Sequence, residues 1–281
     1  MDNLQQLVQP PVNLGQLERS VHQLQEQQGQ LSQVIRCERS VPLNACFKAY
    51  CALKARMGYR VPTKQTLING MLQGAQVLNT TTEVAQQQLE EQIEELQKFI
   101  DTQIDTRDKE RKQFEGYKGL IHGLKPAPSE LTKEALAQRR LIRNSLHSFG
   151  LSVDRVGYSE REVAYLSQVE ELMGEVLYVS QRLGQRSRSL CTTLQRINTA
   201  YNAAINVFDA SSILYRGLSI IEGQVSEIHS GFHQDLLSVM DVHQRMDACP
   251  GVFEQNGLQQ SLATMVGSGV GSYENRRRLS D

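Results

Sequence analysis

The residues of this sequence that could bind a metal ion are its histidines and cysteines. His229 and His233 are four positions apart, so on a helix they would lie on one face, where two imidazoles can hold a metal between turns. The glutamate of the metalloprotease pattern does not follow His229, and Cys249 lies about four helical turns beyond His233. The pattern is typical of histidines on a helix surface or in a bundle, and we predict no metal site.

The cysteines also lack the spacing of a metal site. Cys37, Cys46 and Cys51 are separated by nine and five positions, which does not reproduce the paired CxxC motifs of structural zinc sites. Packing as small apolar side chains explains them better. With Cys191 and Cys249 they form an odd, scattered set, which indicates free thiols in a reducing compartment.

Other chemical motifs are weak. The spacing of Gly267, Gly269 and Gly271 is faintly similar to a phosphate-binding loop, but such a loop needs a preceding strand and a following helix, and the sequence predicts neither. No GxSxG turn or strand scaffold is present to position a catalytic triad. We therefore predict a protein that is not an enzyme and that needs no cofactor.

Charge and hydropathy narrow the classes of partner. The chain has 30 basic and 31 acidic residues, so its net charge of −1 provides no general attraction to nucleic acid or anionic lipid. The most basic stretch, around Arg139, Arg140 and Arg143, is interpreted as a solvated helix face. No window approaches the roughly 18 apolar residues of a transmembrane helix. Because Met1–Gln9 does not have the pattern of a secretory signal, we expect a cytoplasmic protein, with the nucleus or a virion interior as alternatives.

The elements that must position these residues are helices. Aromatic residues make up only 6% of the chain, tryptophan is absent, and the seven prolines leave two long proline-free segments. We predict an all-α fold, an elongated helical bundle or coiled coil with two long helices, short connecting helices and a flexible C-terminal tail. The predicted parts are a coiled-coil helix (1–40), an amphipathic helix (41–61), a long helix (62–125), a turn, short helix and loop (126–159), a long heptad-patterned helix (160–249) and the tail (250–281).

Heptad spacing carries the fold prediction. Leu17, Leu24 and Leu31 belong to a stripe in the first segment whose members alternate by three and four positions. In the segment 160–249 the same register continues for about nine heptads, and a second apolar row runs beside the first. A stripe this wide indicates contact with at least two other helices, as in a three- or four-helix bundle.

These stripes lead to the functional hypothesis of a non-enzymatic coiled-coil structural or assembly subunit. It would associate through its long helices with other coiled-coil proteins or with itself. The predicted interface residues are Leu190, Leu194, Ile197, Tyr201, Phe208, Tyr215, Leu218, Leu17, Leu24 and Leu31. One alternative is a curved helical module that binds anionic lipid, which would need a contiguous basic face. Another is a helical-bundle enzyme or metal carrier, which would need converging Glu and His pairs.

Overall fold

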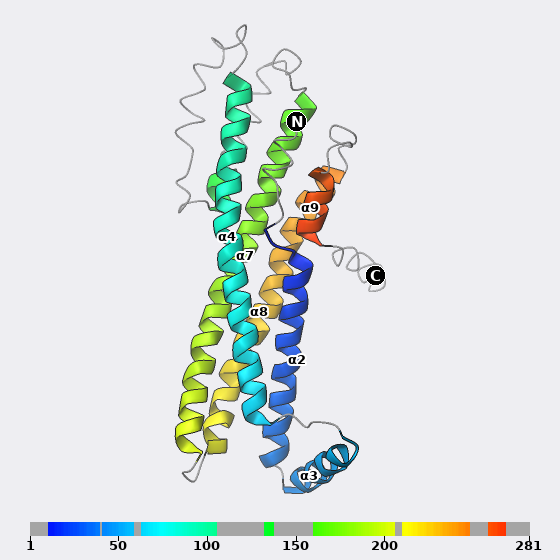
Figure 1. The fold of residues 1–281 in the computed structure, drawn as a ribbon, viewed down its shortest axis with the longest axis vertical. Helices are drawn as coiled ribbons and strands as arrows, with labels where there is room; N and C mark the ends of the chain where they lie inside the picture. Colours follow the sequence, from blue (N-terminus) through cyan, green and yellow to red (C-terminus); the bar gives the residue numbers. More distant parts are fainter. Residues whose placement is uncertain are drawn as a thin grey trace. The chain divides into compact units, whose positions relative to one another are not determined.

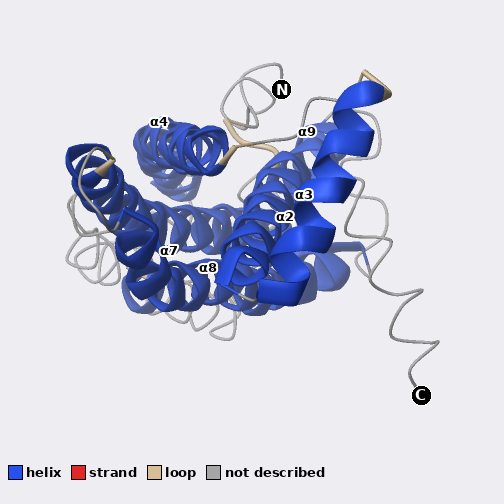
Figure 2. Cartoon of the chain, turned by 90° about the horizontal axis from the view of Figure 1, so that it is seen from below, coloured by secondary structure: helices blue, strands red, loops and turns tan. Residues whose placement is uncertain are grey.

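The computed structural model describes residues 11–39, 41–58, 63–105, 132–137, 160–205, 210–247 and 258–267. Within these ranges the chain is helical apart from short turns and helix ends, and it contains no strand, which confirms the all-α prediction (Figures 1 and 2). The helices are α2 (Leu14–Arg39), α3 (Val41–Arg56), α4 (Lys64–Asp105), α7 (Glu160–Ala204), α8 (Ala210–Asp247) and α9 (Leu258–Val266).

Capping residues mark several helix ends. The Asn13 side chain accepts a hydrogen bond from the Gln16 backbone N–H at 3.2 Å at the start of α2. Thr63 does the same for the Thr66 N–H at 3.1 Å at the start of α4. Both are residue types that satisfy the free N–H groups of a first turn. Gly58, with φ of 78°, follows the end of α3, a position where glycine commonly ends a helix because it adopts a positive φ without strain.

The chain divides into two compact units, which are described separately. Unit 1 comprises residues 1–16, 82–181 and 234–281, and unit 2 comprises 17–81 and 182–233. The helices α4, α7 and α8 therefore each contribute one part to each unit.

In unit 2, α2 runs antiparallel to α4. A Cβ added to Gly74 would lie 3.1 Å from Leu24 Cδ2, so the glycine allows the two helices to approach closely. Further along α2, Glu38 forms an ion pair with Lys64, the first residue of α4. Residues later in α2 thus meet residues earlier in α4, as antiparallel packing requires.

The helices α7 and α8 form an antiparallel hairpin in unit 2. Near the connection, a Cβ on Gly217 would lie 2.7 Å from Ile197 Cδ1. Further from it, Gln224 Nε2 donates a hydrogen bond to Ser189 Oγ at 2.9 Å. Residues later in α8 thus contact residues earlier in α7, as antiparallel packing requires.

Two further contacts complete the bundle of unit 2. Gln65 of α4 donates a hydrogen bond to Asn198 of α7 at 2.8 Å. Ser32 of α2 donates one to Glu222 of α8 at 2.7 Å. Each of these four helices therefore contacts two of the others, which is a four-helix bundle like the one that the wide apolar stripe indicates.

The prediction of one long helix over 160–249 is wrong. The chain forms α7 and α8 in its place, with α7 ending at Ala204 and α8 beginning at Ala210. The sequence between them contains Asn206 and Asp209, which are residue types that disfavour the interior of a helix. Folding back also lets the wide apolar stripe pack on itself, which one straight helix cannot do.

Unit 1 buries charged side chains along α7. Gln97 of α4 donates a hydrogen bond to Glu170 at 2.9 Å, and both side chains are buried. Lys133, in the helical residues 133–137, forms an ion pair with Glu175 at 3.0 Å. These partners compensate for the cost of removing the carboxylates from water. The rest of the predicted turn, short helix and loop (126–159) lies outside the described residues.

The C-terminal segment is not wholly a flexible tail, which corrects the prediction for 250–281. It contains α9, whose side chains Leu262, Met265 and Val266 are buried. Gly267 ends this helix with φ of 85°, and a Cβ there would lie 2.8 Å from the backbone nitrogen of Gly15. This glycine is thus a helix terminus packed on the start of α2. The related Gly269 and Gly271 and the rest of the tail lie outside the described residues.

Candidate metal centre

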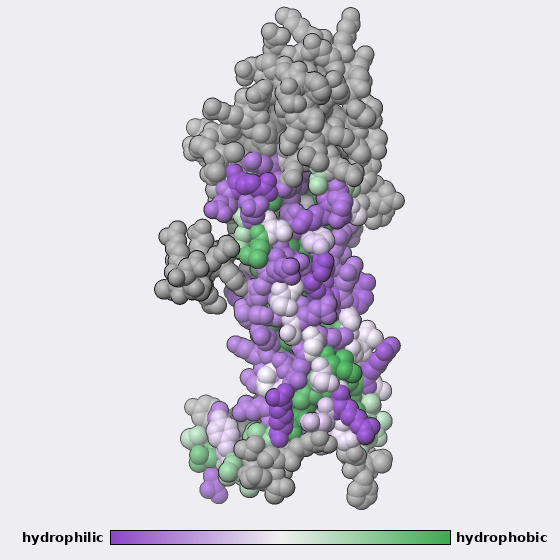
Figure 3. Space-filling model, turned by 180° about the vertical axis from the view of Figure 1, so that it is seen from behind, coloured by the Kyte–Doolittle hydropathy of each residue, from purple (hydrophilic) through white to green (hydrophobic). Residues whose placement is uncertain are grey.

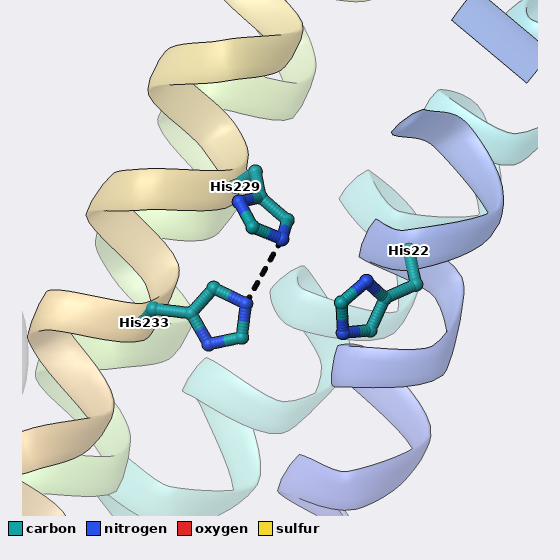
Figure 4. Close-up of side chains that lie close together, drawn as sticks. All are labelled: His22, His229 and His233. Atoms are coloured by element: carbon teal, nitrogen blue, oxygen red, sulfur yellow. Dashed lines mark hydrogen bonds between the residues drawn. The ribbon is translucent and has the colours of Figure 1, made fainter. Parts of the chain in front are cut away.

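Three histidines meet in unit 2, although they come from distant parts of the sequence. His22 lies on α2, and His229 and His233 lie one turn apart on α8. Their rings point toward one another in Figure 4, with the two α8 histidines on one side and His22 facing them. We call these three residues the histidine cluster.

The positions follow from the pairing of two helices. A spacing of four puts His229 and His233 on the same face of α8. The hydrogen bond between Ser32 and Glu222 joins α2 to α8. Because these two helices run antiparallel, His22, which precedes Ser32 on α2, meets residues that follow Glu222 on α8. The tertiary packing therefore supplies the third imidazole.

Ring nitrogens are close together throughout the cluster. The Nε2 atoms of His229 and His233 are 3.1 Å apart, a hydrogen-bond distance if one ring donates and the other accepts. One ligand nitrogen from each of the three rings lies within 4.8 Å of the other two. The ring centroids of His22 and His229 are 5.2 Å apart, and those of His22 and His233 are 5.6 Å apart.

The surroundings favour neutral imidazole at His229. Partial burial lowers the pKa of His229, and the nearby His22 lowers it further, while the carboxylate of Glu18 acts in the opposite direction. Neutral imidazole is the form that binds a metal ion. Glu18 is one turn before His22, and its Oε1 lies 3.9 Å from His22 Nε2.

The cluster is accessible from solvent. The side chain of His22 is 47% exposed, and those of His229 and His233 are half-buried. Among the described residues, the ligand atoms of the histidine cluster lie close enough together to hold one metal ion.

The predicted interface residues lie mostly in the core. The side chains of Leu17, Leu24, Leu31, Leu190, Leu194, Ile197 and Leu218 are buried. Tyr201 is half-buried, Tyr215 is 42% exposed, and Phe208 lies outside the described residues. Their role as partner contacts stays a prediction, but the structure uses most of them for packing within the chain.

Other candidates from the sequence are dispersed. Cys37 and Cys51 are half-buried, Cys46 is exposed and Cys191 is buried, all as free thiols. Cys249, Arg139, Arg140 and Arg143 lie outside the described residues.

The sequence does not predict His22 as a member of the cluster. Its spacing relates only His229 to His233, because a residue about two hundred positions away has no periodic relation to that pair. A useful signal was present: His22 directly follows Val21, a member of the heptad stripe, so its position next to a helix interface could have been predicted.

None of the described helices is both long and apolar enough to cross a membrane.

Comparisons with known proteins add no family assignment. No family model matches the chain, and the searches of curated proteins and of solved structures found no match.

Proposed function

We propose that this protein is a non-catalytic helical assembly subunit, which binds an acidic amphipathic helix of a partner protein through α3. The observation that carries the proposal is an exposed apolar face on that helix. Tyr50, Leu53 and Met57 are 52%, 56% and 57% exposed, and their spacing of three and four positions puts them on one side of α3. We call these three residues the α3 apolar face.

Exposed apolar residues that gather on one helix face are typical of interaction sites. The short helix α3 leaves the end of α2 and shows apolar side chains on the surface in Figure 3, at the lower left. The sequence predicts this stripe as one side of an amphipathic helix. It therefore has the form of an anchor that a partner helix can cover, at positions i, i+3 and i+7.

Charge favours an acidic partner. The helix α3 contains Lys48, Lys54 and Arg56 and no acidic residue. A second copy of α3 would bring like charges together, whereas an acidic helix would be attracted and oriented. The three basic residues are distributed around the circumference of α3, with Ala49, Cys51 and Ala52 between them, so they do not form the single strongly polar face of helices that lie on membranes.

Burial of the heptad stripes also supports this choice of surface. Leu190 and Leu194 are fully buried, so presenting them to a partner would require opening the bundle. The α3 apolar face can be covered without such a change. We therefore propose that the partner binds to α3, and not to the long helices that the sequence predicts as the interface.

Two synthetic helical peptides would test the proposal. Both carry leucine at heptad positions a and d, and one has glutamate and the other lysine at e and g. We expect the fluorescence anisotropy of the labelled acidic peptide to rise on addition of the full chain, with binding weakened by salt. The lysine peptide should not bind.

Matched variants make the test specific. Leu53→Glu should reduce binding of the acidic peptide at least tenfold, because it places a like charge in the apolar contact. Leu237→Glu alters an equally exposed leucine on α8, at 55% exposure, and should leave binding unchanged. The proposal fails if the acidic peptide does not bind below roughly 100 µM, a threshold corresponding to about −5.5 kcal/mol, or if both variants behave alike.

Two further measurements separate the alternatives. Salt-sensitive pelleting with vesicles of phosphatidylcholine and phosphatidylserine, lost in Leu53→Glu, would assign α3 to lipid and overturn the proposal. A concentration-dependent mass in light scattering, also lost in Leu53→Glu, would assign it to a second copy of this chain.

A further inference from the structure

We propose that the histidine cluster binds one divalent zinc ion, which joins α2 to α8 within unit 2. The proposal does not depend on the partner contact at α3. It rests on the meeting of three imidazoles from two helices, with ligand nitrogens within 4.8 Å of one another.

The distances are close to those of a zinc site. In a tetrahedral site with zinc–nitrogen distances of about 2.0–2.1 Å, two ligand nitrogens are about 3.3–3.4 Å apart. The Nε2 atoms of His229 and His233 are already 3.1 Å apart. The third nitrogen has to approach by at most about 1.5 Å, which a change in the side-chain torsions of the exposed His22 can provide.

The donor set selects the kind of metal. Imidazole nitrogen suits zinc, copper and nickel, whereas calcium and magnesium prefer oxygen ligands. A tetrahedral ion bound by three histidines has one position left, which water can occupy. Glu18 lies on the face of α2 that carries His22, and its carboxylate can orient that imidazole or take the remaining position.

Binding would act as a crosslink between helices. Two ligands come from one turn of α8 and one from α2, so a single ion connects segments about two hundred residues apart in sequence. An ion that binds the folded chain and not the unfolded one stabilises the folded state by mass action. The site therefore has the properties of a structural clip that is loaded from solvent through the exposed His22.

Calorimetric titration with zinc chloride would test the site, using the full chain after treatment with a chelator. We expect one ion per chain with a dissociation constant in the micromolar range or below, and no heat from magnesium or calcium. His22→Ala, His229→Ala and His233→Ala should each weaken binding at least tenfold. His243→Ala, which changes another histidine of α8 outside the cluster, should bind zinc as the unmodified chain does.

Cobalt substitution identifies the ligands without relying on stability. A cobalt ion bound tetrahedrally by nitrogen should give visible absorption bands, and the intense near-ultraviolet bands of thiolate ligation should be absent. Equal zinc binding by the unmodified chain and the three cluster variants would overturn the proposal, as would thiolate bands. A titration with no binding below roughly 100 µM, about −5.5 kcal/mol, would do so too.

Discussion

At the scale of the residue, a polar side chain on the apolar stripe of α8 is paired with side chains of α2. Glu222 lies four positions after the buried Leu218 and three before the buried Val225, in the register of the stripe. Its Oε1 accepts hydrogen bonds from Ser32 at 2.7 Å and from Arg36 at 2.9 Å. Ser32 is buried, whereas the side chain of Arg36 is 66% exposed. The buried hydrogen bond should therefore contribute more to stability than the exposed ion pair.

A double-mutant cycle would measure that difference. We expect Glu222→Ala to lower the free energy of unfolding by about 1–2 kcal/mol, because it removes a charged acceptor next to a buried hydroxyl. The coupling between Ser32→Ala and Glu222→Ala should be about 1 kcal/mol, and that between Arg36→Ala and Glu222→Ala below about 0.5 kcal/mol. Urea denaturation measures all of these free energies. A larger coupling of Glu222 to Arg36 than to Ser32 would contradict the prediction.

The cysteines should differ in reactivity. Burial raises the pKa of the Cys191 thiol, so at a given pH less of it is the reactive thiolate. Cys46 is exposed on α3. We expect iodoacetamide at pH 8 to modify Cys46 at least about tenfold faster than Cys191 in the folded protein. Mass spectrometry of digests at successive times would show this, and the two rates should converge in denaturant.

At the scale of the element, glycines in α8 have opposite roles. Gly217 sits against Ile197 of α7, where a Cβ would come within 2.7 Å of Cδ1 and 3.1 Å of Cγ1. Gly223 is exposed, and a Cβ there would meet nothing within 4 Å. The first glycine permits close packing of the α7–α8 hairpin, while the second only makes the helix more flexible.

Alanine at each position would show the contrast. Gly223→Ala should raise the free energy of unfolding by about 0.5–1 kcal/mol, because alanine is the better helix former. Gly217→Ala should be at least about 1 kcal/mol less stable than Gly223→Ala, because Ile197 must move. Thermal denaturation followed by circular dichroism provides the comparison. Equal stabilisation by both changes would show that α7 and α8 are not packed closely at Gly217.

At the scale of the whole molecule, the buried stripes and the exposed apolar residues should respond differently to charge. Leu190 has no exposed surface, whereas Leu237 is 55% exposed. If the apolar stripes pack against helices of the same chain, charged substitutions in them should destabilise the folded chain and not only weaken its association with other chains.

We therefore expect Leu190→Glu to lower the free energy of unfolding by about 3–5 kcal/mol, because it buries an unpaired carboxylate. Leu237→Glu should change it by less than about 0.5 kcal/mol. Circular dichroism melts at several protein concentrations would test this. Unchanged helicity in Leu190→Glu, together with a lower mass in light scattering, would show that the stripe serves a partner chain instead.

Periodicity in the sequence determined the helical class and the buried faces, because each buried position depends on neighbours three or four residues away. In α8 the two predicted rows are buried, at positions such as Leu218, Val225, Ile221 and Ile228. In α4 the buried face also includes Ala75, Thr82 and Ala85, whose small or polar side chains give only a weak apolar signal in the sequence.

Tertiary structure alone decided where the long heptad segment reverses and which histidines meet. A heptad register is the same for one straight helix and for two helices that fold back, so the break between Ala204 and Ala210 leaves little trace in the pattern. The pairing of His22 with His229 and His233 depends on the register between α2 and α8. That register is determined by close packing and by contacts such as Ser32 with Glu222, which join residues that are far apart in the sequence.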